Sequence, residues 1–284
     1  MQVTIGHLGP TGTYAEMAAL TFQTWLQEDR SQASVLAAYP TIAQTLQAVA
    51  QNQVDLAIVP VENSVEGGVT MTMDTLWQLD QLQIQHALTI PIHHALISCA
   101  QQIGEIQTVY SHPQALAQCQ HWLATHLPQA QAQATNSTTE ALTTLSQKPT
   151  IGAIASQRAA ALYKLPILAC PINDYPDNQT RFLVLSREDS PGGTYTSLAF
   201  SIAANRPGSL LKMLQIFADR EINLSRIESR PSKRSMGDYL FFLDLEADAR
   251  DPITKAALRA LMAQAETVKL FGSYDLKNYT EASK

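Results

Sequence analysis

Positive charge is almost missing from the first half of this 284-residue chain. Arg30 is the only lysine or arginine among residues 1–147, which contain ten aspartates and glutamates, and the whole chain has a formal net charge of -6. Binding to nucleic acid or to an acidic membrane surface depends on clustered Lys and Arg side chains. The sequence therefore predicts neither nucleic acid nor membrane as a partner.

Long apolar runs and a targeting segment are also lacking. No stretch approaches the roughly 18 apolar residues of a membrane helix, and the opening Met-Gln-Val-Thr-Ile-Gly-His has no basic region followed by an apolar one. Cys99, Cys119 and Cys170 are an odd number at wide spacing, which fits neither a disulfide framework nor a metal site. We therefore expect a cytoplasmic protein.

Signatures of metal and nucleotide sites are missing as well. The neighbouring His93 and His94 point to opposite sides of a strand, and no cysteine or carboxylate stands at ligand spacing from them. The loop 9–13 contains neither the Gly-Lys-Ser/Thr of a P-loop nor G-x-G-x-x-G. The sequence thus predicts no metal and no cofactor.

Up to about residue 185, short apolar runs alternate with amphipathic stretches, which is typical of α/β proteins with a largely parallel sheet. The extended segment 84–98 and the segment 169–181 are long enough to carry the chain between two lobes. We therefore expect a two-lobed region over 1–188, with lobe one at about 1–82 and 170–188, lobe two at about 83–169, and a ligand site between them. The expected strands are 3–8, 57–61, 107–110, 151–155 and 182–185, and the expected helices are 14–26, 41–52, 69–79, 113–126, 138–146 and 157–162.

A second domain is expected after residues 188–193, Glu-Asp-Ser-Pro-Gly-Gly, which are polar, rich in turn formers and typical of a linker. The pattern over 194–276 is β-α-β-β-α-β, a ferredoxin-like unit of the size of a small regulatory or binding module. Its expected strands are 197–203, 223–229, 239–245 and 268–274, and its expected helices are 207–220 and 252–265.

Small polar residues follow each apolar run of the first region, at the start of a helix. Helix N-termini carry unsatisfied N–H groups and partial positive charge, so they can bind a carboxylate without lysine. Ser, Thr and Asn are also ordinary helix caps, so each loop alone has a purely structural explanation. Together, on a parallel sheet, the loops are expected to open toward the same edge or cleft. The five loops are 9–13, 62–68, 111–114, 136–138 and Ser156.

The run Asn-Gln-Thr-Arg-Phe at 178–182 places a hydroxyl, a guanidinium and an aromatic ring at the start of an apolar strand. Strand alternation sends Thr180 and Phe182 to one face and Arg181 to the other, but a bend at the strand end lets all three converge. Arg181 is then a candidate for anion binding; the alternative is an arginine that pairs with a carboxylate. Glu62 is either an acid projected into the site or a helix-start carboxylate favoured by the dipole.

Taken in order, these motifs closely resemble those of the prephenate dehydratase family, in its form without a fused mutase domain. The match runs nearly end to end. The motifs are Leu-Gly-Pro-Thr-Gly-Thr-Tyr at 8–14, Pro-Val-Glu-Asn-Ser-Val-Glu-Gly-Gly at 60–68, Ser-His-Pro-Gln at 111–114 with Cys119, Asn-Gln-Thr-Arg-Phe at 178–182, Pro-Gly-Ser-Leu-Leu at 207–211 and Ile-Glu-Ser-Arg-Pro at 227–231. The departures are His7 where an aromatic residue is usual, Tyr14 where Phe is usual, and Ser209-Leu210-Leu211 where Ala-Leu-Val is common.

The resemblance implies a catalytic region built like a two-lobed type II periplasmic binding protein, followed by an ACT domain that binds phenylalanine and inhibits. It also implies a homodimer or homotetramer. The candidate catalytic residues are Thr180, Arg181, Phe182 and Glu62, and the candidate substrate-binding residues are Thr11, Thr13, Asn63, Ser64, Gln114, Ser137 and Thr138. The candidate residues for phenylalanine are Pro207, Gly208, Ser209, Leu210, Leu211, Asn223, Leu224, Glu228, Ser229, Arg230 and Pro231.

The implied reaction converts prephenate to phenylpyruvate, CO2 and water in L-phenylalanine biosynthesis, and aromatisation of the ring drives it. Such a reaction needs a proton donor for the departing hydroxyl and an anchor for the side-chain carboxylate. We expect Arg181 and helix-start N–H groups to hold carboxylate, with Ser64 and Ser137 or Thr138 helping.

The expected roles in the chemical step fall to three residues. Thr180 delivers or relays the proton, with Glu62 as the rival donor, and Phe182 packs against the ring. Two other functions are open at this point: an arogenate dehydratase, which acts on the amino-acid counterpart of prephenate, and a non-catalytic amino-acid sensor.

Overall fold

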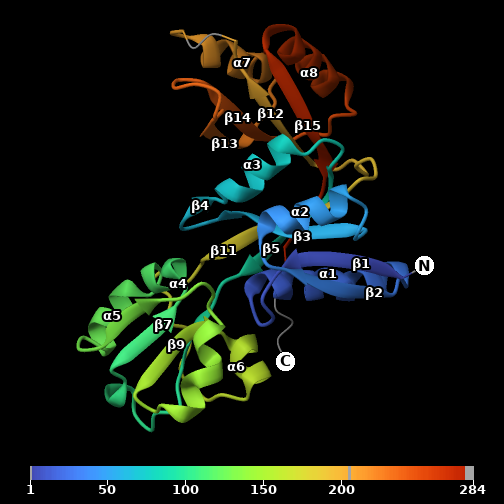
Figure 1. Cartoon of the computed structure of the whole chain (residues 1–284). Helices are drawn as coiled ribbons and strands as arrows, with labels where there is room; N and C mark the ends of the chain where they lie inside the picture. The colour runs from blue at the N-terminus through green and yellow to red at the C-terminus, as the bar shows by residue number, and fades with distance from the viewer. Residues whose placement is uncertain (1, 204–205, 279–284) are drawn as a thin grey trace.

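The computed structural model describes residues 2–203 and 206–278, and they form three parts (Figure 1). Lobe one, in the middle, is built on a seven-stranded sheet. Lobe two, with a five-stranded sheet, lies on one side of it, and a four-stranded sheet with two helices lies on the other. No helix in the described part of the chain is long and apolar enough to cross a membrane.

The sheet of lobe one is mixed rather than parallel. Its order is β16-β5-β11-β3-β1-β2, with β4 paired to β3, and β11 runs antiparallel between β3 and β5. Because β3 ends where β11 begins, residues 62–63 lie directly beside 180–181. The strands are β1 (Val3–Leu8), β2 (Ser34–Tyr39), β3 (Leu56–Asn63), β4 (Gly67–Gly68), β5 (Gln83–Pro91), β11 (Gln179–Ser186) and β16 (Leu276–Asn278).

Two apolar cores enclose this sheet, one on each face. Phe182 and Val184 of β11 belong to the core under α1, whereas Leu183 and Leu185 belong to the core formed with α2, α3 and the C-terminal domain. Strand alternation thus decides which face each residue of β11 serves. The helices are α1 (Tyr14–Arg30), α2 (Ile42–Ala50) and α3 (Thr70–Gln78).

Lobe two has the strand order β10-β6-β9-β7-β8 and its own apolar cores. The helix expected over 113–126 is in fact two helices, because the Asp174 carboxylate accepts the N–H groups of His121 and Trp122 at the start of the second. The elements are β6 (His94–Ile97), η1 (Ile103–Glu105), β7 (Thr108–Ser111), α4 (Pro113–Ala117), α5 (Gln120–His126), β8 (Gln131–Ala134), η2 (Glu140–Gln147), β9 (Ile151–Ser156), α6 (Gln157–Tyr163) and β10 (Ile167–Ala169).

The segment expected as an α-helix over 138–146 is the 3-10 helix η2 instead. The hydroxyls of Thr143 and Thr144 donate to the backbone carbonyls three residues earlier, those of Glu140 and Ala141. Side chains that bond to the local backbone compete with regular α-helical hydrogen bonding, and short helical segments then tighten to the 3-10 form.

The chain leaves lobe one later than about residue 83 and returns to it later than about residue 170. All of β5 pairs with β11 in the sheet of lobe one, so lobe two begins after Pro91. On the return, Ile172 lies in a core of lobe two, and its N–H donates to the carbonyl of His94 at 2.9 Å. The two crossing segments are therefore 92–93 and about 173–178.

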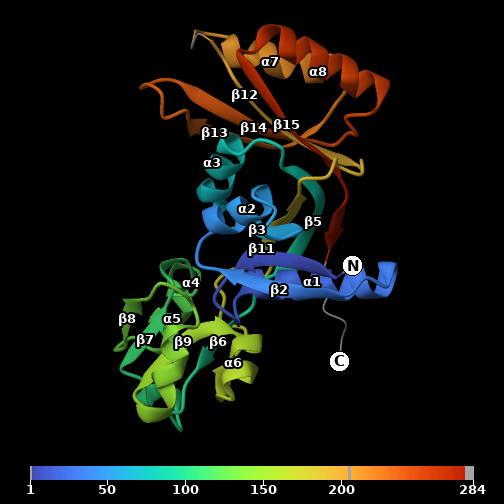
Figure 2. The ribbon, with the colours of Figure 1, turned by 45° about the vertical axis from the view of Figure 1, so that its right-hand side comes forward.

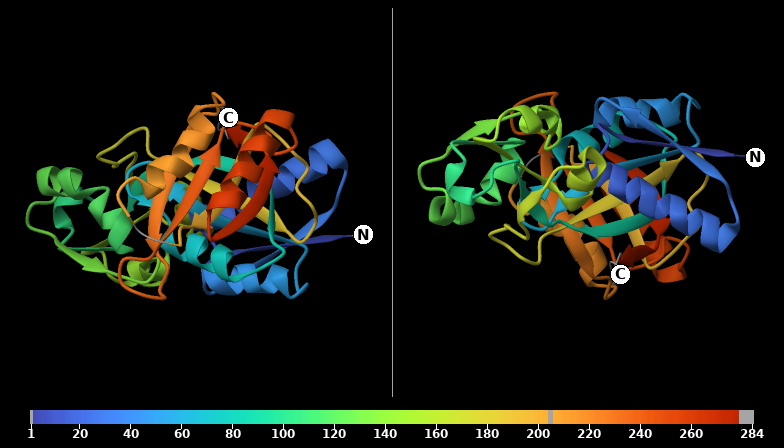
Figure 3. Two further views of the ribbon diagram at one scale, coloured as in Figure 1. Left: turned by 90° about the horizontal axis from the view of Figure 1, so that it is seen from above. Right: turned by 90° about the horizontal axis from the view of Figure 1, so that it is seen from below.

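The C-terminal domain has the expected β-α-β-β-α-β order, with strands arranged β13-β14-β12-β15. From above, α7 (orange) and α8 (red) lie across the outer face of the sheet (Figure 3). The inner face packs on α2 and α3 of lobe one (Figure 2), where Ala199, Phe242 and Phe271 enter the shared core. The elements are β12 (Tyr195–Ser201), α7 (Ser209–Ala218), β13 (Leu224–Pro231), β14 (Tyr239–Leu245), α8 (Pro252–Gln264) and β15 (Thr267–Tyr274).

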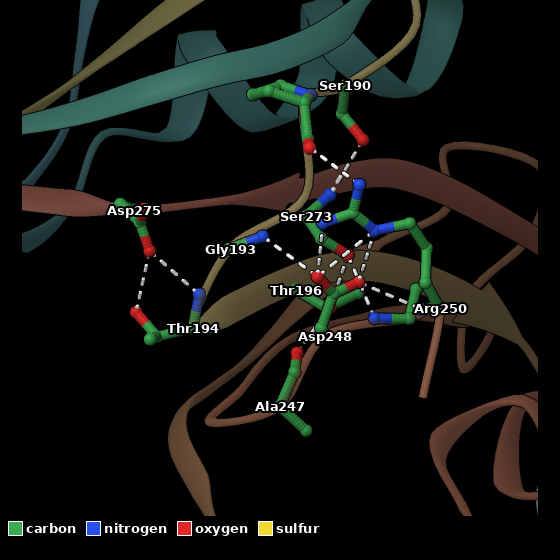
Figure 4. Close-up of polar contacts among 11 residues, drawn as sticks. Ser190, Gly193, Thr194, Thr196, Ala247, Asp248, Arg250, Ser273 and Asp275 are labelled. Atoms are coloured by element: carbon green, nitrogen blue, oxygen red, sulfur yellow. Dashed lines mark hydrogen bonds and ion pairs between the residues drawn. The ribbon is translucent and has the colours of Figure 1, made fainter. Parts of the chain in front are cut away.

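The expected linker is held along a fixed path by the C-terminal domain (Figure 4). The Gly193 N–H donates to the Asp248 carboxylate at 3.0 Å, and Arg250 Nη1 donates to the carbonyl of Pro191 at 2.7 Å. Arg250 also pairs with Asp248 at 2.7 Å. The turn formers here therefore shape a connection between lobe one and the C-terminal domain that is fixed by hydrogen bonds and an ion pair.

Replacing Gly193 with alanine is expected to destabilise the protein. Gly193 has a φ of +153°, and a β-carbon there would overlap the carbonyl carbon of Tyr274. Because both the backbone conformation and the space exclude a side chain, we expect a loss above about 1 kcal/mol in the free energy of unfolding. Urea denaturation measures it, with Gly104→Ala as the control, because a β-carbon at Gly104 meets nothing within 4 Å. Equal stability of the two variants would contradict this explanation.

Candidate active site

A buried hydrogen-bond network lies where β3 ends and β11 begins. The side-chain nitrogen of Asn63 donates to Thr180 Oγ1 at 2.9 Å and to Asn178 Oδ1 at 2.8 Å. The Asn63 Oδ1 accepts the N–H groups of Val65 and Glu66, each at 3.0 Å. Asn63 thus fixes the turn after β3 and orients the hydroxyl of Thr180. Since that hydroxyl oxygen accepts a hydrogen bond, its own hydrogen is left to be donated elsewhere.

Lobe two enters the same network through Gln118, which is only 3% exposed at the end of α4. Gln118 Nε2 donates to Asn63 Oδ1 at 3.3 Å, and its Oε1 accepts from Asn178 Nδ2 at 2.8 Å and from His94 Nε2 at 3.0 Å. One amide therefore joins the end of β3, the start of β11 and the first strand of lobe two.

His94 is a neutral member of this network. Burial lowers the pKa of its imidazole to about 4, against the weaker opposing effect of the hydrogen bond to Gln118. Because Gln118 Oε1 only accepts, the hydrogen of the ring lies on Nε2. The Tyr14 ring packs edge-on against His94, and its hydroxyl donates to the carbonyl of His93 at 2.7 Å.

Sequence reasoning missed three residues of the network. Asn178 stands two residues before Thr180 in the same motif, but the pattern alone does not assign it to the site. Gln118 follows the candidate Gln114 by one helical turn, a spacing that indicates a shared helix face. His94 carries no signal beyond its neighbour His93, because neither composition nor periodicity shows that a strand end will be buried between lobes.

A second contact between the lobes lies at the start of α1. The Ser156 hydroxyl donates to the carbonyl of Gly12 at 2.8 Å, and the Glu16 carboxylate accepts from the Gly12 N–H and from Arg158 Nε. A β-carbon at Gly12 would lie 3.2 Å from the Thr139 side chain, and its φ is +90°. Two of the five predicted loops, 9–13 and Ser156, therefore meet here, and Thr139 directly follows a third, 136–138. They follow strands of two separate sheets, each of which is mixed rather than largely parallel as expected.

The remaining candidate substrate residues have simpler surroundings. Thr13 caps α1 through the N–H of Glu16, and Thr11 is exposed beside it. Ser64 Oγ donates to Asn178 Oδ1 at 3.3 Å and accepts the Gln179 N–H at 2.9 Å, so it belongs to the network. The half-buried Ser137 and Thr138 and the exposed Gln114 lie outside it.

The structure does not bring Thr180, Arg181 and Phe182 together. Arg181 Nη2 contacts Glu62 Oε2 at 2.9 Å and Asp244 Oδ2 at 2.6 Å, on the face of the sheet that meets the C-terminal domain. Phe182 is 2% exposed in the core under α1. The expected convergence at a bent strand end is therefore wrong. Arg181 is engaged by carboxylates, Glu62 lies on the same face as Arg181, and Phe182 has no free face for a substrate ring.

The candidate phenylalanine residues of β13 divide between two faces. Glu228 and Arg230 face lobe one: the Glu228 carboxylate lies against Gly68, and Arg230 Nη2 pairs with Asp74 of α3 at 3.3 Å. Ser229 lies on the opposite face of the strand, where its side chain is exposed. Leu224 and Arg226 also lie on opposite faces, because the register shifts between them. Leu224 packs on the helix side, whereas Arg226 pairs with Asp244.

The residues around the start of α7 lie on the helix side of the same domain. Gly208 has a φ of +81° at the helix start, Leu211 is 65% exposed, and Asn223 Nδ2 donates to Glu246 Oε2 at 2.9 Å. A small hollow lies nearby, lined by Ile202, Ser209, Leu210, Gly237, Asp238, Tyr239 and Phe241.

The fold and the network between the lobes define a two-lobed α/β protein with a ferredoxin-like domain packed on one face. A model of the family described as prephenate dehydratase matches residues 5–190, and a model of the ACT domain matches residues 196–261. The chain belongs to the prephenate dehydratase family, and the expected fold class is confirmed.

Similar proteins include enzymes and solved structures. The prephenate dehydratase of Amycolatopsis methanolica is 37% identical over 95% of this chain and 88% of its own length. The crystal structure of prephenate dehydratase in complex with L-Phe from Arthrobacter aurescens is 33% identical, covers 96% of this chain and 90% of that one, and has a TM-score of 0.85. The structure of GqqA, described as a novel type of quorum quenching acylase, is 27% identical, covers 96% and 98% of the two chains, and has a TM-score of 0.79.

Proposed function

We propose that this chain converts prephenate to phenylpyruvate, CO2 and water at the junction of its two lobes, with 1–188 as the catalytic region and 194–276 as the regulatory domain. The observation that supports this function most is the neutral, buried network around Thr180. It is built from both lobes inside the segment that matches the family, and it ends in an oriented hydroxyl.

The network suits a reaction in which a hydroxyl must leave as water. Asn63 donates to Thr180 Oγ1, which directs the hydroxyl hydrogen of Thr180 away from Asn63 and toward a bound substrate. A positioned proton donor or relay typically contributes 10²–10⁴-fold to the rate. Glu62 is the weaker candidate for this role, because its carboxylate pairs with Arg181 on the opposite face of β11.

Arg181 points away from the network around Thr180, and this arrangement also suits a decarboxylation. A guanidinium paired with the ring carboxylate would stabilise the charge that the reaction has to remove, whereas the side chains of Asn63, Gln118, Asn178 and Thr180 are neutral. The side-chain carboxylate of prephenate needs an anchor. We assign this anchor to the N–H groups and hydroxyls at the start of α1, with Ser64 and Ser137 or Thr138 helping.

Phenylalanine is the proposed effector, bound on the helix side of the ACT domain between the 207–211 turn and β13. The Arthrobacter aurescens prephenate dehydratase was solved in complex with L-Phe, which supports this choice of ligand.

The strand β13 is at the edge of its sheet and exposes Ile227 to 49%, which favours pairing with a second copy. We therefore propose a homodimer or homotetramer, located in the cytoplasm.

The function is tested by incubating the purified chain with prephenate and, separately, with arogenate, each with and without phenylalanine. Rapid release of phenylpyruvate that phenylalanine suppresses is the expected result. Turnover of arogenate alone would reassign the substrate. Hydrolysis of an N-acylated amide in place of both would assign the acylase activity named for the 27% identical structure. If phenylalanine binds but neither prephenate nor arogenate is turned over, the chain would be assigned as a non-catalytic amino-acid sensor.

A further inference from the structure

A buried ionic cluster joins the catalytic strands to the ACT domain. It contains two arginines and three carboxylates, and none of its side chains is more than 36% exposed. We call it the junction cluster; its members are Glu62 of β3, Arg181 of β11, Arg226 and Glu228 of β13, and Asp244 of β14.

Asp244 is the centre of the junction cluster and is 1% exposed. Its Oδ2 accepts from Arg181 Nη2 at 2.6 Å and from Arg226 Nε at 2.9 Å, while its Oδ1 accepts from Ser197 Oγ at 2.5 Å. Burial disfavours the charged carboxylate, but the two guanidinium groups and the hydrogen bonds outweigh it and lower the pKa of Asp244 to about 2. Asp244 is therefore a fixed negative charge under Arg181.

The position of Arg181 in the strand makes this charge relevant to catalysis. Thr180 pairs with Asn63 and Arg181 pairs with Glu62, but the register between β3 and β11 shifts immediately after Arg181. A bulge weakens the ladder locally, so the backbone alone holds the Thr180–Asn63 pair less firmly than a regular sheet would. The ion pairs of Arg181 with Glu62 and Asp244 hold the strand at this register shift, one residue from the proposed proton donor.

We propose that Asp244, a residue of the ACT domain, is a positioning residue for the dehydratase reaction, acting through Arg181 to hold Thr180 against Asn63. The inference rests on the proposed function. The same carboxylate is held by Arg226 of β13, the strand that contributes Ser229 and Pro231 to the proposed effector site. Asp244 is therefore the acceptor shared by the catalytic strand and the effector strand.

The test is the kinetics of Asp244→Asn on prephenate in the full-length protein. The substitution keeps the shape of the side chain and removes its charge. Because a misplacement of roughly 1 Å can cost about 10²-fold in rate, kcat is expected to fall by about 10- to 100-fold while KM changes by less than about threefold. The control is Asp74→Asn, which removes an ion pair between the same two domains, with Arg230 and Lys233, but on α3 rather than on β11. This control is expected to keep its kcat within about twofold, and a kcat loss equal to that of Asp244→Asn would overturn the proposal.

A double-mutant cycle separates positioning through Arg181 from a general loss of domain contact. If Asp244 acts through Arg181, combining Asp244→Asn with Arg181→Met lowers kcat no further than Arg181→Met alone, whereas independent effects multiply. Multiplied losses would overturn the proposal, and so would an Arg181→Met variant with unchanged kcat.

Asp244→Asn leaves two buried cations undercompensated, so thermal unfolding is measured for every variant. If it does not fold, Asp244→Glu replaces it, since this change keeps the charge and displaces the carboxylate by one methylene. A folded Asp244→Glu enzyme with reduced kcat supports the proposal, and one with wild-type kcat overturns it.

A wild-type protein that does not turn over prephenate would overturn the proposed function and this inference together. An active wild type with an equally active Asp244→Asn would overturn the inference alone.

Discussion

Thr180→Ala is expected to lower kcat for prephenate by roughly 10²–10⁴-fold, because the hydroxyl that donates or relays a proton to the departing oxygen is removed. The structure supports this size of effect, since Thr180 is only 9% exposed and its hydroxyl is held by Asn63 at 2.9 Å. KM is expected to change much less than kcat, because a contact that strengthens only in the transition state contributes little to ground-state binding. Steady-state kinetics on phenylpyruvate formation measures both.

Two further variants separate this role from a loss of packing. Thr180→Ser keeps the hydroxyl and is expected to retain most of the activity, whereas Thr180→Ala is not. Thr45→Ala removes a fully buried threonine in α2, whose hydroxyl donates to the Thr41 carbonyl rather than to a member of the network, and it is expected to leave kcat within about twofold. An unchanged kcat in Thr180→Ala would remove Thr180 from the chemical step.

The loops that approach the site were predictable because helix caps and turns leave a local signature. Gly12 and Ser156 lie at the transition from a strand to the helix that follows it, Asn63 ends β3 before the turn to β4, and the structure brings all three to the two contact zones between the lobes. The alternating pattern that separates Thr180 from Arg181 was also visible. What could not be read from the sequence was that Asp244, 63 residues away, would hold Arg181 on the far face.

Short exposed strands and cross-lobe contacts escaped prediction for a different reason. β8 consists of four exposed residues, Gln131–Ala134, whose short alternation of Gln and Ala is too weakly apolar to indicate a buried face, and its place at the sheet edge follows only from its pairing with β7. Gln118 is a polar residue whose burial depends on lobe one covering it. Its partner Asn63 is 55 residues away, and no periodicity within either segment connects the two.

The structure of the ACT domain divides the segment 228–231, which is expected from the sequence to bind phenylalanine, between two faces of β13. A strand has two faces, so the Glu-Ser-Arg-Pro segment of β13 cannot present all four side chains to one ligand. Arg230 is paired with Asp74 of α3, and Glu228 lies against Gly68, which follows the active-site turn. Two of the residues expected to bind phenylalanine therefore contact lobe one, while Ser229 and Pro231 remain on the side of the proposed effector.

Asn63→Asp is expected to lower kcat by about 10²-fold or more while the protein stays folded. Aspartate keeps an oxygen that accepts the N–H groups of Val65 and Glu66, so the turn after β3 is preserved. It loses the donor to Thr180 Oγ1 and to Asn178 Oδ1, and a carboxylate there would compete with the substrate for the hydroxyl hydrogen of Thr180. The added negative charge also opposes the binding of a dianionic substrate, so KM is expected to rise.

The exposed Asn52→Asp supplies the matched control for this change of an amide to a carboxylate, and it is expected to leave both kinetic constants unchanged. A thermal midpoint for Asn63→Asp close to that of the wild type, together with the kinetic loss, would assign the amide to orienting Thr180. If kcat were unchanged, the hydrogen bond between Asn63 and Thr180 would have no part in the reaction. If instead Asn63→Asp lost activity only in proportion to its loss of stability, the role of Asn63 would be to stabilise the turn after β3. Its hydrogen bond to Thr180 would then have no separate effect on the reaction.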